Sequence, residues 1–282
     1  AAVVVVEPVL ERLVAVAPLL HFLDAIHLPH LIFVNKMDRS EVRWRDLLAG
    51  LRAVSQRPVV PHLYAIGRGE GLVGYVDLVD EKAWHFKAGA PSDEMSMPEE
   101  YRDRESQARQ EMLETLADFD DELLEQLLED RPVDPGTVLR DLARGLSADS
   151  VVPVLLGVAE RDMGVRRLLR AVVEEAPDAG VTAERLGIAK DGPPLVQILK
   201  TYHVPHAGKL SLARVWRGPL KDGVQLDGSR VSGLFEVNGA RTEAAGEAES
   251  GTIVGLGRME GVRTGDVLGG TEGAASSLLS LE

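Results

Sequence analysis

The stretch "LIFVNKMDRS", residues 31 to 40, joins an apolar run to a polar loop. Its first four residues are large and apolar, as expected of a strand that is covered on both faces. Asn35, Lys36 and Asp38 follow directly. Open α/β sheets place their ligands beyond the carboxyl ends of their strands. The stretch therefore predicts a parallel strand of an α/β domain that carries a binding loop at its end.

The polar residues of this loop suit a guanine base better than an adenine base. A carboxylate at Asp38 can accept two hydrogen bonds from adjacent N–H groups, and guanine offers such a pair at N1 and its 2-amino group. The Asn35 amide can brace the loop or touch the base, and the Lys36 stem can lie along the ring face. Polar residues after a strand also form ordinary turns, so the context decides. Here an apolar strand precedes the loop and a helical pattern follows it, which favours the nucleotide interpretation.

Strands and helices alternate on both sides of this loop. "AAVVVV" at residues 1–6 predicts a first strand, and residues 8–27 predict a helical segment that Pro18 kinks or divides. "SEVRWRDLLAGLRAVSQ" predicts a helix after the loop. The pattern returns with a strand at "VVPVLLGVAE" and a helix at "GVRRLLRAVVEEAP", whose expected apolar face is Val165, Leu168, Leu169, Val172 and Val173. This order predicts βαβ units on a parallel sheet.

The segment between these two α/β parts has a different pattern. Residues 57–89 contain short alternating strands punctuated by glycines, which predicts a small antiparallel sheet. Pro98 opens a long acidic helical region, whose expected apolar face is Met112, Leu116, Phe119, Leu123, Leu124, Leu127 and Leu128. We therefore expect an insertion from residue 61 to residue 150.

The last third of the chain predicts a second domain. The stretch "DAGVTAERLGIAKDGPP", residues 178–194, is polar and punctuated by glycine and proline, which is typical of a linker, expected here at residues 179–192. Short strands marked by glycine fill residues 193–270 and predict a small β-barrel. Residues 271–282 are expected to form a tail.

Composition excludes several classes of function. The chain of 282 residues has no cysteine, which excludes disulfides, thiolate metal sites and a cysteine nucleophile. A net charge of −14 argues against general attraction to nucleic-acid phosphates, so no DNA partner is expected. "AAVVVV" is too short to span a bilayer and lacks a basic leader, so no membrane partner is expected either.

Two further motifs carry weaker signals. His203 and His206 in "HVPH" stand three residues apart, a spacing that some metal sites use, but no helix or carboxylate partner accompanies them. We therefore predict no metal site. "GRGEG" at residues 67–71 lies between strands and leads to no helix, so a tight turn is expected rather than a phosphate loop.

Several stretches resemble one family of proteins. "LPHLIFVNKMDRS" closely resembles the guanine-specificity segment of translational GTPases, specifically elongation factor G and its paralogues. "AIGRGEGLVGYVDLVDEKAWHF" is similar to the start of that family's insertion into its G domain, and "VVPVLLGVAERDMGVRRLLRAVVEEAP" to its last G-domain strand, base-binding loop and closing helix. "GKLSLARVWRGPLKDG" and "GTIVGLGRMEGVRTGDVL" are similar to its second domain, a β-barrel. The resemblance covers nearly the whole chain in order.

The resemblance implies a fold and its boundaries. The fold is α/β, a partial P-loop-NTPase-type parallel sheet with an α+β insertion, followed by an all-β translation-factor barrel. Residues 1–60 and 151–178 would be the carboxyl half of the G domain, 61–150 its insertion, 179–192 a linker, 193–270 the barrel and 271–282 a tail.

The resemblance also implies the residues that bind the base. They are Asn35, Lys36 and Asp38, together with the backbone amides of a second loop at Val158 and Ala159. The family usually carries a Ser-Ala pair in that second loop. Here Val158 replaces the serine, so an amide is retained while the hydroxyl that would brace the loop is lost.

By the same resemblance, the intact protein would bind GTP or GDP with Mg²⁺ in the cytoplasm, engage the ribosome, and couple hydrolysis to translocation or a related step. The sequence contains no G-x-x-x-x-G-K-[ST] motif and no switch segment to supply Mg²⁺ ligands. Phosphoryl transfer depends on those parts. We therefore expect a fragment that begins midway through a G domain, has no catalytic residue of its own and is inactive alone.

Two alternatives remain open. One is a ribosome-protection or release-factor GTPase, which would share the base-binding loop but serve another step. The other is a paralogue that has lost GTPase activity and acts as a ribosome- or protein-binding module. The altered "GVA" loop at residues 157–159 favours the second alternative.

Overall fold

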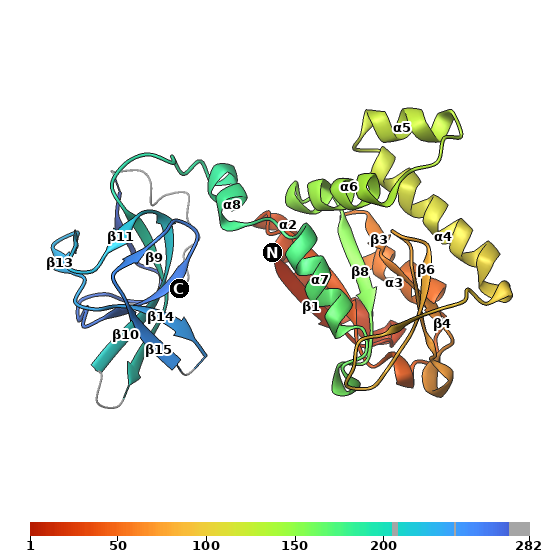
Figure 1. Cartoon of the computed structure of the whole chain (residues 1–282), viewed down its shortest axis with the longest axis horizontal. Helices are drawn as coiled ribbons and strands as arrows, with labels where there is room; N and C mark the ends of the chain where they lie inside the picture. Colours follow the sequence, from red (N-terminus) through yellow and green to blue (C-terminus); the bar gives the residue numbers. More distant parts are fainter. Residues whose placement is uncertain (205–207, 240, 271–282) are drawn as a thin grey trace. The chain divides into compact units, whose positions relative to one another are not determined.

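The computed structural model describes residues 1–204, 208–239 and 241–270 and is shown in Figure 1. The chain divides into two units, Ala1–Pro177 and Asp178–Glu282. The tail expected at residues 271–282 and His206 of the "HVPH" motif lie outside the described residues.

A parallel sheet organises the first unit. Its strands are β1 (Ala2–Val6), β2 (His30–Val34), β8 (Val152–Leu156) and β3 (Val59–Pro61), in the spatial order β1-β2-β8-β3. Every residue of β2 and of β8 is buried, which explains why their sequences are continuously apolar rather than alternating. The α/β expectation is confirmed.

The helices of this part follow the predicted order. The segment expected over residues 8–27 is divided into α1 (Leu10–Leu13), a 3₁₀ turn η1 (Val14–Val16) and α2 (Ala17–Ala25). Pro18 lies in the first turn of α2, where its missing N–H leaves no bond unmade. The other two helices are α3 (Trp44–Val54) and α7 (Val165–Glu175). The predicted apolar face of α7 is wrong at Leu169 and Val173, because both side chains are exposed.

The inserted segment folds as an antiparallel sheet followed by helices. Its strands are β4 (Leu63–Ile66), β5 (Gly74–Asp77), β6 (Lys82–His85) and β7 (Asp93–Met95), with a 3₁₀ turn η3 (Gly69–Gly71) after β4. Its helices are α4 (Glu99–Ala117), α5 (Asp121–Leu128) and α6 (Pro135–Ser147). The chain leaves the parallel sheet at β3 and returns at β8, the neighbouring strand.

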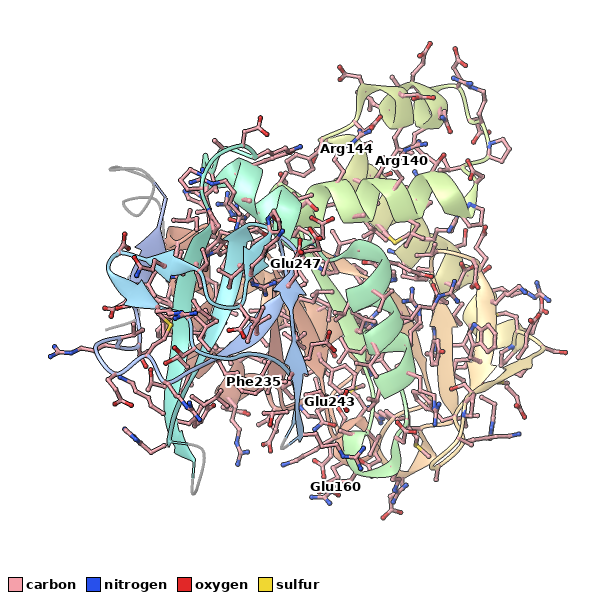
Figure 2. The ribbon with its side chains drawn as sticks, turned by 60° about the vertical axis from the view of Figure 1, so that its left-hand side comes forward. Arg140, Arg144, Glu160, Phe235, Glu243 and Glu247 are labelled. Carbon is pink, nitrogen blue, oxygen red and sulfur yellow. The ribbon has the colours of Figure 1, made fainter. Side chains whose placement is uncertain are left out.

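The apolar face predicted for the long helical region is only partly correct. Met112, Leu116 and Leu123 are buried, whereas Phe119, Leu124 and Leu128 are exposed, Leu128 to 79%. The cause is a break between α4 and α5: the Asp120 carboxylate accepts bonds from two backbone amides and starts a new helix. If α4 and α5 are treated as one continuous helix, Leu124 and Leu128 are assigned to the buried face although they are exposed. Arg144 of α6, labelled in Figure 2, makes an ion pair with the same carboxylate.

A buried polar network fixes α7 to the insertion. The His62 and Glu175 side chains are fully buried, and His62 Nε2 lies 2.8 and 2.9 Å from the two Glu175 oxygens. Arg167 donates to His62 Nδ1 at 2.9 Å and to Asp77 at 2.5 Å. Because the guanidinium can only donate, Nδ1 is the accepting nitrogen and Nε2 carries the proton that bonds Glu175. The network joins β5 and the β3–β4 connection to the closing helix.

The second unit is a β-barrel preceded by a short helix. Its main sheet, in the described residues, has the order β15-β14-β17-β10-β9-β18, with bounds β9 (Leu195–Val204), β10 (Gly208–Arg217), β14 (Leu234–Asn238), β15 (Arg241–Ala245), β17 (Ile253–Gly257) and β18 (Val267–Gly269). Two short ribbons complete it: β11 (Leu220–Lys221) with β16 (Glu247–Ala248), and β12 (Gln225–Leu226) with β13 (Ser229–Arg230). One apolar cluster, which includes Val196, Val215 and Leu256, fills the interior. The expectation of an all-β barrel is confirmed.

The segment expected to be a linker starts with a helix. Helix α8 spans Ala179–Arg185, and the Asp178 carboxylate caps it by accepting a bond from the Val181 amide at 2.8 Å. The glycines and prolines that suggested a linker lie mostly after this helix, between residues 187 and 194. Local capping therefore orders the part of the segment that carries no proline.

We expect Arg167→Met to lower the free energy of unfolding of the first unit by about 3 to 5 kcal/mol. The substitution keeps an apolar stem but leaves the buried Asp77 carboxylate and His62 Nδ1 without their donor. Urea denaturation of the 282-residue chain, followed by circular dichroism, measures the change. Arg170→Met is the matched control on the same helix, because the Arg170 ion pair with Glu174 is exposed and should contribute less than about 1 kcal/mol. Equal losses in the two variants would contradict a stabilising role for the network.

Candidate functional site

Backbone hydrogen bonds bring the two predicted base-binding loops together at the carboxyl ends of the strands. The backbone N–H of Asn35 donates to the Val6 carbonyl at 2.9 Å, and the backbone N–H of Gly157 donates to the Val34 carbonyl at 3.0 Å. The Met37 amide then donates across to the Gly157 carbonyl at 3.2 Å. Gly157 permits the tight return of the second loop, since a side chain there would collide with the Met163 carbonyl oxygen. Loops that are about 120 residues apart in sequence therefore form one surface.

Asn35 and Ala159 are in direct contact. The Ala159 amide donates to Asn35 Oδ1 at 2.8 Å, so the asparagine side chain braces the second loop from the first. Val158 does something different: its side chain is buried in the core of the first unit, and its amide donates to the Met163 carbonyl at 2.9 Å. The structure thus brings Ala159 to the exposed edge and turns Val158 inward.

Lys36 adopts a left-handed backbone conformation with φ of 60°. This conformation is uncommon for a residue with a side chain, and here it begins the 3₁₀ turn η2 (Met37–Arg39). The Lys36 ammonium makes a hydrogen-bonded ion pair with Glu7, which also pairs with Arg12. The hydrogen bond from Lys36 holds the pKa of Glu7 below its ordinary value, and the Arg12 charge acts in the same direction.

Asp38 differs from Asn35 and Lys36 in its hydrogen bonding. Its side chain is 15% exposed, and its Oδ1 is buried without a hydrogen-bond partner in the part of the chain that the structure describes. Its Oδ2 lies 3.6 Å from the Arg161 guanidinium. A buried carboxylate oxygen without a donor is unfavourable unless a ligand or water supplies one. Asp38 Oδ1 is therefore an acceptor of this surface whose hydrogen-bonding capacity is unused among the described residues.

Sequence reasoning missed Glu7, Arg39, Glu160 and Arg161. Glu7 follows the first strand directly, so its place at the same sheet edge could have been inferred from the parallel order. Arg161 directly follows the "GVAE" segment and lies 3.6 Å from Asp38 Oδ2. Arg39 and Glu160 join the two loops through an ion pair of 3.3 Å, and Figure 2 labels Glu160 in the second loop. No spacing in the sequence signals that pair.

The glycine-rich stretch of the insertion supports the first loop from the side. Gly67 and Gly69 have φ of 86° and 54°, and Gly69–Gly71 form the turn η3, as the tight-turn prediction expected. Arg68 donates to the Glu41 carbonyl at 3.2 Å. A side chain at Gly69 would come within 3.0 Å of the Ser40 carbonyl oxygen. The start of the insertion therefore packs against the end of the loop that contains Asp38.

A separate cavity of about 620 Å³ lies between α3 and α4. Arginine and aromatic side chains dominate its lining, among them Arg43, Trp44, Arg52, Tyr101 and Arg104. None of the five predicted base-binding residues lines it. The candidate site is accordingly an open edge of the sheet rather than this cavity.

We expect Asn35→Ala to accelerate hydrogen exchange of the Ala159 amide by roughly fivefold, because the variant removes its acceptor and such a bond contributes about 1 kcal/mol. Nuclear magnetic resonance of the labelled chain measures the rate. Asn35→Asp is the matched control, since it retains an acceptor oxygen and should leave the amide protected. Unchanged exchange in Asn35→Ala would show that the contact does not hold the second loop.

Comparisons with known proteins identify relatives of this chain. No protein-family model matches the chain. The chain is 45% identical over 269 residues to an elongation factor G-like protein of Synechocystis sp., an alignment that covers 95% of this chain and 40% of that protein. It is 29% identical to elongation factor G 2 of Syntrophomonas wolfei, over 87% of this chain and 38% of that protein. It is 28% identical to elongation factor G of Mycoplasma pneumoniae, over 85% and 38% of the respective chains.

A solved structure supports the same relationship. A crystal structure of a protein from Thermus thermophilus superposes with a TM-score of 0.76 at 30% identity, covering 90% of this chain and 38% of that one. None of the helices among the described residues is long and apolar enough to cross a membrane. The chain spans about 40% of the length of the curated relatives it matches. Along nearly all of its own length, this chain is a homologue of the elongation factor G-like proteins.

Proposed function

We propose that this chain supplies the guanine-recognition loops and the adjoining β-barrel of a translational GTPase resembling elongation factor G. In this proposal the whole protein binds GTP and GDP with Mg²⁺, acts on the ribosome, and couples hydrolysis to translocation or a related step. The names of the relatives support this assignment, and so does the order of sheet, insertion and barrel. We also retain the domain boundaries inferred from the sequence as part of the proposal.

The observation that carries the proposal is the unpartnered buried oxygen of Asp38. It lies at the carboxyl edge of a parallel sheet, where such folds bind nucleotides. Guanine presents two adjacent donors, N1–H and the 2-amino group, which match the two oxygens of one carboxylate. Adenine has no such pair, so Asp38 would discriminate between the two purines.

The neighbours of Asp38 suit a flat ring. The Lys36 ammonium is held by Glu7, so its aliphatic stem is fixed at the same edge and can cover one ring face. Arg161 lies 3.6 Å from Asp38 and is exposed, so it can move aside when the carboxylate accepts bonds from a base. Asn35 keeps the second loop in place through its bond with Ala159.

A second candidate is a relative without GTPase activity that serves as a binding module. The observation that favours it is Val158, which has no hydroxyl to brace the loop and whose amide is committed to Met163. In the first candidate the whole protein hydrolyses GTP, and in this second candidate it does not. A role in ribosome protection or peptide release would share the same base-binding edge.

We expect guanosine at millimolar concentration to shift the amide resonances of residues 35–39 and 157–161, and adenosine to leave them unchanged. A nucleoside tests base recognition alone, because the sequence carries no phosphate-loop motif. Asp38→Asn should abolish the response to guanosine and create one to xanthosine, whose 2-oxo group needs a donor. Asp46→Asn, at an exposed carboxylate on α3, is the control. Equal responses to guanosine and adenosine would reject the proposed specificity.

We also expect the 282-residue chain to show no GTP hydrolysis above buffer in a phosphate-release assay, because phosphoryl transfer requires a phosphate cradle and Mg²⁺ ligands. Turnover that Asp38→Asn abolishes would show that the chain contains catalytic residues other than those identified from its sequence.

A further inference from the structure

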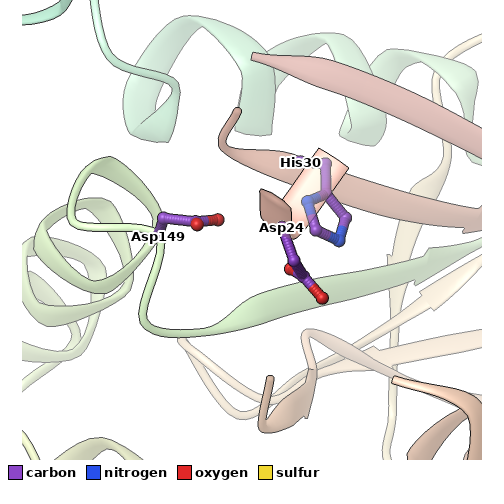
Figure 3. Close-up of side chains that lie close together, drawn as sticks. All are labelled: Asp24, His30 and Asp149. Atoms are coloured by element: carbon purple, nitrogen blue, oxygen red, sulfur yellow. The ribbon is translucent and has the colours of Figure 1, made fainter. Parts of the chain in front are cut away.

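A second polar cluster lies at the other end of the parallel strands, where the strands begin. Asp24 is at the end of α2, His30 begins β2, and Asp149 precedes β8, so all three are near the amino ends of the strands (Figure 3). One ligand atom from each residue lies within 4.8 Å of the other two. The sequence predicted no metal site, and these residues escaped notice because Asp149 is far from the other two in the chain.

The three side chains are buried and incompletely bonded. Asp24, His30 and Asp149 are 5%, 1% and 5% exposed. Both Asp24 oxygens and His30 Nε2 have no hydrogen-bond partner among the described residues. Buried polar atoms of this kind normally have a partner. Unpartnered atoms on two of the three clustered side chains suggest a ligand that is not part of the chain.

The tautomer of His30 suits a metal ion. His30 Nδ1 lies 3.1 Å from the Leu28 carbonyl oxygen, which can only accept, so Nδ1 carries the hydrogen. In the neutral ring the lone pair is then on Nε2, the atom without a partner. Histidines that bind metals are typically held by such a bond from the other nitrogen to a carbonyl or carboxylate.

The net charge of the cluster and its neighbours favours binding of a cation. Arg57 donates to Asp149 at 3.2 Å, and its Nε is 3.6 Å from Asp24. His27 Nδ1 lies 3.6 Å from the same Asp149 oxygen, on a side chain that is largely exposed. Two carboxylates against one guanidinium give a net charge of −1 when the histidines are neutral. An uncompensated buried negative charge is unfavourable, and a bound divalent cation would compensate the charge of the two carboxylates.

We propose that Asp24, His30 and Asp149 form a binding site for one divalent transition-metal ion of the zinc type. One imidazole and two carboxylates are a ligand set that zinc accepts, with water in the fourth position. Zinc bonds of about 2.0 to 2.2 Å place ligand atoms roughly 3 to 4 Å apart, so rotation of the carboxylates closes the site. The ion would tie the α2–β2 turn to the α6–β8 connection.

The test measures zinc retention directly. The 282-residue chain, stripped with chelator and dialysed against micromolar zinc, should keep one zinc per chain and gain thermal stability, while magnesium should give no such gain. Asp24→Asn and His30→Gln should each weaken zinc binding at least tenfold. His21→Gln, at an exposed histidine of α2, and Asp46→Asn are the matched controls and should bind as the parent does.

Two further measurements hold even if a ligand variant fails to fold. Cobalt bound to the unmodified chain should show visible absorption typical of nitrogen and oxygen ligands, which zinc should displace. Arg57→Gln should bind zinc more tightly, because it removes the competing cation, and zinc should restore the stability lost in that variant. Absence of retained zinc would overturn the proposal and indicate buried water at the site. Retention unaffected by Asp24→Asn and His30→Gln would overturn it as well.

Discussion

The register of two parallel strands determines the geometry of the surface formed by the two candidate base-binding loops. β2 and β8 pair Ile32 with Val154, Phe33 with Leu155 and Val34 with Leu156. The loop that contains Asn35 and the loop that contains Ala159 therefore leave the sheet side by side. A slip of one residue would send every side chain of β8 to the opposite face of the sheet, where the close-packed neighbours do not match it, because this strand is buried on both faces. The apolar core thus fixes the positions of polar groups that contribute little to it.

The insertion is compatible with this register because of where it enters the sheet. β3 and β8 are neighbours and pair Val59 with Val152, so the inserted segment begins and ends at adjacent strands. When the ends of an inserted segment lie close together, a long segment costs little more in chain entropy than a short one. The insertion keeps its own apolar core, which includes Met112 and Leu142, and the buried His62–Glu175 pair ties its first strands to the closing helix.

Most of the fold was predictable because its signals are local. Buried strands have continuous apolar runs, and Pro18 marks the point where a helix is divided. The failures arose where a capping group outweighed the pattern: Asp120 starts a new helix and leaves Leu128 exposed, and Asp178 starts a helix in an expected linker. The candidate site was predictable at Asn35 and Asp38, which follow a strand directly. Arg161 and the partners of His30 were not, because tertiary pairing of distant segments brings them together. Glu7 was missed although it follows the first strand directly.

The bond between Asn35 and Ala159 changes what a bound base could contribute to affinity. If the oxygen of a purine took the Ala159 amide, Asn35 would lose that donor, so one hydrogen bond would replace another. Such a swap adds little net free energy, however well it is aligned. Tightness would then have to come from contacts with the rest of a nucleotide. The Asp38 carboxylate, one of whose oxygens starts without a hydrogen-bond donor, would decide only which base is accepted.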